Sequence, residues 1–215
     1  MSQEVFEIVK GMDFKAAETQ LALHCAPLIA GIKASNLLIV YKEIADDIID
    51  ILRNTDISYC ILSNNEGKCT ILLYQKELLK ACLMNDEAQN LLKKYGYDTS
   101  DFYGMLEIFL KHYKVYAKTG EGYPHEIGIF LGYPAEDVEG FIENDGKNFL
   151  CTGYWKVYED MPAKIKLFEK YERARETSIQ LISYGADILD IISFWAENGL
   201  ANSNIYKNKK IMKAI

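Results

Sequence analysis

The sequence predicts an α+β fold, in which a small, mostly antiparallel sheet of three to four strands is covered by several helices. Three observations predict it. Residues 57–74 form two β-rich runs around a turn sequence, which is the pattern of a hairpin. Apolar spacing marks more helices than strands along the chain. The predicted strands also do not alternate regularly with helices, as the strands of a doubly wound sheet do.

The hairpin gives the clearest strand signal. Its runs SYCILS and CTILLY are separated by Asn64-Asn65-Glu66-Gly67. If these four residues form the loop, Cys60 and Cys69 lie diagonally on one face, roughly 7 Å or more apart, which is a poor spacing for a disulfide. Two more strands are expected, a short buried one over residues 36–41 and a third main one over residues 149–158.

Helices are predicted from apolar residues at helical spacing and from cap and stop residues. Pro134 stands where the first turn of one helix begins, Glu136 and Asp137 are placed favourably for its dipole, and Gly146 ends it. The predicted helices cover residues 42–53, 76–95 with a break near Asn85-Asp86, 100–118 with Thr99 or Ser100 as the cap, 134–144, 160–183 and 186–197.

A single domain is expected. The chain has 215 residues, of which 49% are hydrophobic, so it can bury a sizeable core. It contains no linker, low-complexity segment or internal repeat. We therefore predict one domain over residues 1–200, with the helix at 186–197 as an extra C-terminal element, and a basic, flexible tail over residues 201–215.

The charge balance restricts the partners. Acidic residues outnumber basic ones by 31 to 24, and the formal net charge is -7. This balance disfavours a general attraction to nucleic acid or anionic lipid. No apolar segment approaches the roughly 18 to 20 residues of a spanning helix, and the N-terminus lacks the pattern of a secretory signal. The expected location is the cytoplasm, with neither nucleic acid nor membrane as a partner.

The five cysteines form an odd set without a C-x-x-C pair. This disfavours a disulfide framework and a structural zinc site. No motif in the chain indicates a particular cofactor. Each thiol is expected to be a small buried hydrophobe, with Cys25 as the exception considered below. The five are Cys25, Cys60, Cys69, Cys82 and Cys151.

The first candidate site is the corner YPHEIGIFLGYP, residues 123–134. Prolines and glycines restrict its backbone, so His125 and Glu126 are expected to be presented in one orientation. His125 and Glu126 begin a zinc-protease motif, but the second histidine is replaced by Ile129, so no metal site is predicted. The restricting residues are Pro124, Gly128, Gly132 and Pro134.

Two other segments contribute candidates. His24 and Cys25 are adjacent, so their side chains point apart in a regular element, and a reactive thiol would need a partner such as His125 from elsewhere in the fold. The alternative is a buried cysteine beside a hydrogen-bonded histidine. Lys33 ends the same segment. In the run YWKVY, Tyr154 and Trp155 either line a ligand pocket or pack on a sheet face under a helix.

Four segments carry a resemblance to a known family. They are HCAPLIAGIK at 24–33, the hairpin and the following helix through Gly96-Tyr97, the segment from Tyr123 through Phe149, and GYWKVY at 153–158. In these segments the chain resembles domain of unknown function 3793 (DUF3793), a family found mainly in anaerobic Gram-positive bacteria. The resemblance spans about residues 20–175, and the stretch after about Thr177 departs from it. The resemblance implies no established activity, although it points to a role in metal or redox homeostasis.

Two functions are left open. The first is a non-catalytic ligand-binding or regulatory domain, whose candidate binding residues come from the three segments above and whose partner is an unknown small molecule or protein. The alternative is an enzyme in which Cys25 acts as nucleophile or metal ligand with His24, His125 and Glu126. The candidate binding residues are His24, Cys25, Lys33, His125, Glu126, Tyr154 and Trp155.

Overall fold

The structure is a computed structural model that describes residues 1–198. The expected basic tail over residues 201–215 lies outside these residues. The fold is α+β, as predicted. Its main sheet contains β1 (Ser35–Tyr41), β2 (Ile57–Asn65) and β3 (Lys68–Gln75) in the order β1-β3-β2, with antiparallel pairing throughout. Strand β3 is central and is buried on both faces, because helices cover both sides of the sheet.

The hairpin turn is tighter than expected. Asn65 pairs with Lys68, so only Glu66 and Gly67 form the loop, both with positive φ of 50° and 76°. Such two-residue turns match the twist of paired strands. A bulge between Ile61 and Ser63 then shifts the register.

The tight turn and the bulge correct the expected placement of two cysteines. Cys60 lies opposite Leu72, whereas Cys69 lies opposite Asn64. Neighbouring residues along β3 point to opposite faces, and Cys69 and Leu72 are three residues apart. Cys60 and Cys69 therefore lie on opposite faces of the sheet, and the prediction of a shared face was wrong.

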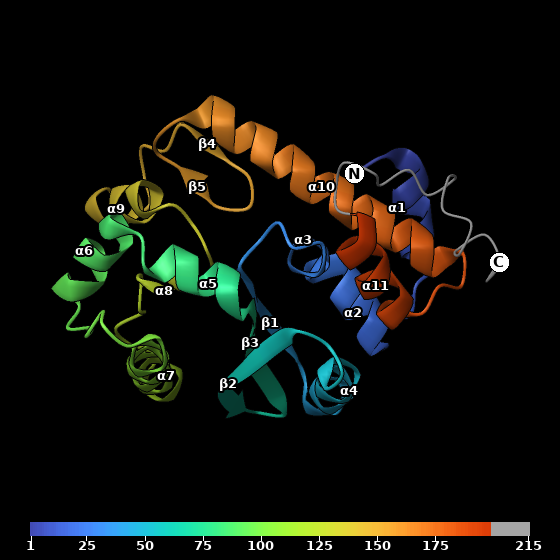
Figure 1. Cartoon of the computed structure of the whole chain (residues 1–215), viewed down its shortest axis with the longest axis horizontal. Helices are drawn as coiled ribbons and strands as arrows, with labels where there is room; N and C mark the ends of the chain where they lie inside the picture. Colours follow the sequence, from blue (N-terminus) through green and yellow to red (C-terminus); the bar gives the residue numbers. More distant parts are fainter. Residues whose placement is uncertain (199–215) are drawn as a thin grey trace.

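Each face of the sheet supports its own hydrophobic core (Figure 1). One face, with Leu38, Ile71 and Leu73, packs on helices from the two ends of the chain. The other face, with Leu72 and Tyr74, packs on helices from its middle. The first group comprises α2 (Ala17–His24), α3 (Ala26–Ile29), α4 (Lys42–Leu52) and α11 (Ile188–Asn198), and the second comprises α5 (Lys76–Leu83), α6 (Asp86–Lys94), α7 (Phe102–Thr119) and α8 (Ile127–Phe130).

The long helix α10 (Met161–Ser183) packs on α2, α3 and α11 of the first group. Its residue Tyr171 lies in a cluster with Tyr133, which also packs against the core of the second group. Figure 1 shows α10 running from α9 (Ala135–Glu143) and the small hairpin of β4 (Cys151–Thr152) and β5 (Lys156–Val157) to α1 (Gln3–Lys10). The predicted helices are therefore present, with small shifts in their ends. The cap of α7 differs from the prediction, since Asp101 rather than Thr99 or Ser100 caps this helix. Asn85 caps α6, and both caps act through side-chain hydrogen bonds to backbone N–H groups.

The expected third main strand over residues 149–158 is absent from the sheet. This segment instead forms β4 (Cys151–Thr152) and β5 (Lys156–Val157), which pair with each other as a separate two-stranded hairpin. The backbone N–H of Gly153 donates to the carbonyl of Trp155, which closes the turn between them. Trp155 is thereby turned into a third, aromatic core with Val157 and Tyr171.

None of the helices in residues 1–198 is both long and apolar enough to cross a bilayer.

Candidate functional site

The corner at residues 123–134 is built around the single-turn helix α8. Its residues Ile127, Gly128, Ile129 and Phe130 are all buried, which fixes the segment against α7 and α9. A Cβ atom placed on Gly128 would lie 2.6 Å from Cγ2 of Val138 on α9. Gly128 is therefore required for the close approach of α8 and α9, and its φ lies outside the left-handed region. The tight packing places the preceding His125 at the surface.

A pocket of about 300 Å³ opens beside this corner, between α8, α9 and the β4–β5 hairpin. Aromatic rings form much of its wall. The rings of Tyr133 and Trp155 are stacked with centroids 4.8 Å apart. The exposed ring of His125 lies 5.4 Å from that of Tyr123 and 5.5 Å from that of Phe141. The lining residues are Tyr123, His125, Ile127, Gly128, Leu131, Tyr133, Asp137, Val138, Phe141, Tyr154, Trp155 and Lys156.

Asp137 joins the hairpin to α9 at the base of the pocket. Asp137 is only 2% exposed. Its Oδ2 accepts a hydrogen bond of 2.7 Å from Nε1 of Trp155, and its Oδ1 accepts from the backbone N–H groups of Tyr158 at 2.7 Å and Glu159 at 3.1 Å. A buried carboxylate is tolerated where several donors satisfy it. Asp137 therefore holds Trp155 in the wall of the pocket.

Lys156 contributes a positive charge to the lining. Its Nζ donates a hydrogen bond of 2.7 Å to the carbonyl of Gly146. It also lies 5.6 Å from the centroid of Phe141 and 5.0 Å from that of Phe149, within the range of a cation–π contact. An ammonium group has three N–H donors, and within residues 1–198 one of them has a hydrogen-bond acceptor. The others are available to a bound molecule.

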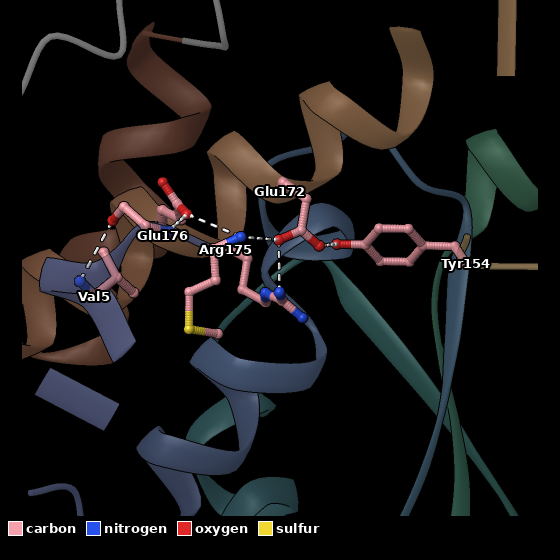
Figure 2. A network of polar contacts seen from close by, with 7 residues as sticks. Val5, Tyr154, Glu172, Arg175 and Glu176 are labelled. Atoms are coloured by element: carbon pink, nitrogen blue, oxygen red, sulfur yellow. Dashed lines mark hydrogen bonds and ion pairs between the residues drawn. The ribbon is translucent and has the colours of Figure 1, made fainter. Parts of the chain in front are cut away.

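The tyrosines of the pocket act as neutral hydrogen-bonding groups. Burial raises the pKa of Tyr133 to about 12, and the nearby Tyr123 adds to the shift. Burial and the carboxylate of Glu172 raise the pKa of Tyr154. The Tyr154 hydroxyl donates a hydrogen bond of 2.9 Å to Oε1 of Glu172 on α10, and Figure 2 shows the same carboxylate contacting Arg175. The ring of Tyr154 is thus anchored from behind the pocket.

Glu126 does not share the exposed position of its neighbour His125. It is 2% exposed, and its Oε1 accepts a hydrogen bond of 3.0 Å from the hydroxyl of Tyr97. Nδ1 of His112 on α7 lies 2.8 Å from the same oxygen. Burial and the Glu126 carboxylate raise the pKa of Tyr97, so its phenol stays a donor. The expected joint presentation of His125 and Glu126 was therefore wrong, because Glu126 is used to tie the corner to α7.

Cys25 lies in the core under the other face of the sheet, with no exposed surface. Burial raises the pKa of its thiol to about 12, against smaller opposing effects of Lys33 and of a hydrogen bond from Asn36. The adjacent His24 is exposed at the end of α2, and partial desolvation and the nearby Arg175 lower its pKa. Helix α8, which begins two residues after His125, packs in the core on the opposite face of the sheet. A catalytic pairing of Cys25 with His125 does not fit this geometry.

Lys33 lies between Cys25 and the pocket beside His125. It is 6% exposed, and its Nζ donates a hydrogen bond of 2.8 Å to Oδ1 of Asn36. Nδ2 of Asn36 lies 3.5 Å from Sγ of Cys25. Burial lowers the pKa of Lys33 to about 8. Its ammonium is also 5.7 Å from the ring centroid of Tyr133, so it lies behind one wall of the pocket.

The family comparison agrees with the resemblance. The family model described as a protein of unknown function, DUF3793, matches residues 21–192. The chain belongs to the DUF3793 family. The match passes the expected point of departure near Thr177 and includes the first residues of α11, so the family includes more of the C-terminal part than the sequence suggested. No curated protein and no solved structure matches the chain significantly.

The structure brings three of the predicted residues together in this DUF3793 domain. His125, Tyr154 and Trp155 all line the pocket, and Lys33 lies behind it. His24, Cys25 and Glu126 are elsewhere. Across residues 1–198, no cluster of three or more histidine, cysteine, aspartate or glutamate side chains is arranged to hold a metal ion.

Sequence reasoning missed the residues that complete the site. Asp137 was interpreted as a helix-dipole residue, whereas its main partners are the hairpin donors. Phe141 lies in no motif, and Lys156 was passed over within the run YWKVY, because the role of both depends on contacts between α9 and the hairpin. His112 gives no sequence signal, because its partner Glu126 is fourteen residues away and lies in a different element. A spacing pattern within one helix or strand cannot reveal such pairs.

Proposed function

We propose that this chain is a non-catalytic domain that binds a small molecule in the aromatic pocket beside His125. The observation that carries the proposal is the pocket itself. About 300 Å³ of space is enclosed by five aromatic side chains together with a few polar groups. Ligand sites are typically concave and mostly apolar, with a small number of polar groups that fix the orientation of the ligand.

His125 supports the proposal because it is held by ring contacts alone. In the described part of the chain, neither of its ring nitrogens has a hydrogen-bond partner. A structural histidine normally satisfies at least one nitrogen within the fold or with water. An exposed imidazole between Tyr123 and Phe141, at a pocket, is in position to bond to a ligand.

The alternative, an enzyme that uses Cys25, has less support. A nucleophilic or metal-binding cysteine acts as a thiolate, whereas burial raises the pKa of this thiol to about 12. A cytoplasmic location and a link to metal or redox homeostasis stay predictions.

Ligand-observed NMR tests the proposed function. A set of one-ring and two-ring aromatic fragments, with positive, neutral and negative substituents, is screened for saturation transfer from the wild-type protein. We expect several fragments to bind, and we expect the Phe141→Ala variant, which lacks one wall of the pocket, to lose most of this binding. Phe14→Ala is the matched control, because Phe14 is exposed and does not line the pocket. Equal binding by all three proteins, or no binding by any, would contradict the proposal.

A further inference from the structure

We infer that the pocket takes a small aromatic carboxylate, meaning one ring or two fused rings with a carboxylate on a short arm. The inference rests on the proposed function, since it names the ligand class of the same pocket. It combines the size of the pocket, its ring walls and the charges that the protein leaves unpaired there.

The size of the pocket limits the ligand to a small ring system. An apolar cavity of about 150 Å³ holds benzene. The pocket of about 300 Å³ therefore has room for one or two rings and a short substituent. The stacked pair of Tyr133 and Trp155 and the ring of Phe141 supply flat surfaces, against which an aromatic ring packs better than a branched aliphatic group.

The one carboxylate of the pocket lining is already engaged in the described chain. Asp137 is the one carboxylate among the lining residues of the described chain. Both its oxygens are engaged, Oδ2 by Trp155 and Oδ1 by the backbone N–H groups of Tyr158 and Glu159. The hydroxyl of Tyr154 is directed to Glu172, outside the pocket lining. A cationic ligand therefore meets no free carboxylate at this site.

The donors of the pocket, in contrast, are available. Lys156 uses one of its three N–H groups in the hydrogen bond to the carbonyl of Gly146. Its ammonium group lies near the rings of Phe141 and Phe149. His125 has both ring nitrogens free of protein partners within residues 1–198. Hydrogen bonds from a cation to a carboxylate are stronger than those between neutral groups. These two side chains are suited to hold an anionic substituent.

The acidic residues on α9 do not reverse this preference. Glu136 is paired with Lys164 at 2.8 Å, and Glu139 is paired with Lys94. Neither of these glutamates lines the pocket, and nor does Glu143 at the end of α9. The charges of Glu136 and Glu139 are partly neutralised by these lysines, and solvent screens them further. The local charge at the pocket is thus set mainly by Lys156.

Isothermal titration calorimetry with three matched probes tests the inference. Indole-3-acetate carries the carboxylate, indole-3-acetamide is its neutral counterpart of nearly the same shape, and tryptamine carries a positive charge. We expect indole-3-acetate to bind at least about tenfold more tightly than either of the other two probes, because only its carboxylate can form a charge-assisted hydrogen bond with Lys156. In Lys156→Met, which keeps the aliphatic stem, this preference should fall to about threefold or less.

Lys147→Met is the control variant, because Lys147 is exposed and outside the pocket. It should keep the full preference for the carboxylate. If the three probes bind equally to the wild type, the proposed function stands and the inference about charge is wrong. If none of them binds at concentrations up to several millimolar, the inference is also wrong. The fragment screen then shows whether the pocket takes another class of ligand or whether the proposed function fails as well.

Discussion

The indole nitrogen of Trp155 donates a hydrogen bond of 2.7 Å to the buried carboxylate of Asp137. This contact joins the turn of the β4–β5 hairpin to the first turn of α9. Two backbone N–H groups that follow β5 bond to the same carboxylate. One side chain therefore fixes the position of the hairpin, and with it the aromatic wall of the pocket.

Asp137→Ala should destabilise the protein by roughly 2–4 kcal/mol, because it leaves three donors near the pocket without their acceptor. Urea unfolding measures the change. Glu143→Ala, on the exposed side of the same helix, is the control and should change the free energy of unfolding by no more than about 0.5 kcal/mol. A loss from Asp137→Ala as small as that of the control would show that the hairpin is held by packing alone.

Gly128→Val should destabilise the protein by about 1–3 kcal/mol or more, because its Cβ would overlap Cγ2 of Val138 at 2.6 Å. His125→Ala should cost little, since this side chain is exposed and has no hydrogen bond within residues 1–198. Thermal melts compare the two variants. Adding Val138→Ala to Gly128→Val should recover part of the loss. Equal damage from His125→Ala and Gly128→Val would assign His125 to the scaffold.

Cys25 should be the slowest thiol to react in the folded protein. A pKa of about 12 leaves on the order of 10³-fold less thiolate at neutral pH than an unperturbed thiol has, and the side chain has no exposed surface. Brief alkylation with iodoacetamide followed by mass spectrometry should find the partly exposed Cys151 modified and Cys25 intact. After unfolding in urea, both should react. Rapid labelling of Cys25 in the folded state would revive the nucleophile hypothesis.

Lys33 should make stability depend on pH. Burial lowers its pKa from 10.5 to about 8. Between these values the unfolded chain binds a proton that the folded protein has released, so the contribution of Lys33 to stability rises with pH. From pH 7 to pH 9, wild type should gain on the order of 1 kcal/mol relative to Lys33→Met.

Urea unfolding of both proteins at the two pH values measures this relative gain. The comparison with Lys33→Met is needed because the thiol of Cys25 acts in the opposite direction. Its raised folded-state pKa lowers stability once the pH exceeds the ordinary thiol value of 9.0. A constant difference between wild type and Lys33→Met from pH 7 to pH 9 would mean that the ammonium group is as well solvated in the folded protein as in the unfolded chain.

The sequence predicted those parts of the fold that depend on local patterns. The hairpin and the main helices follow from residue spacing and caps, and they are present. The prediction of a third main strand at 149–158 was wrong. Its alternation resembles that of a strand, but Trp155 in this segment bonds to Asp137, which lies eighteen residues away in the sequence. The bulge after Ile61, which the turn sequence does not reveal, separated Cys60 from Cys69.

The candidate site was predicted only in part, for the same reason. Prolines and glycines drew attention to the corner that carries His125, and the aromatic run drew attention to Tyr154 and Trp155, which line the same pocket. The expected orientation of the Glu126 side chain was wrong, because its partners Tyr97 and His112 come from a different part of the chain. Whether a carboxylate faces solvent or the core is decided by such tertiary partners, which neighbouring residues do not encode.

A crystallographic fragment screen tests the central claim most directly. Crystals of the protein are soaked individually with one-ring and two-ring aromatic fragments, and the sites that they occupy are located. The account predicts fragments in the pocket between His125 and Trp155, with the ring against Tyr133 or Phe141 and any carboxylate towards Lys156. Fragments that bind only elsewhere, while this pocket stays open to solvent and empty in every soak, would contradict the claim that the corner carries a ligand site.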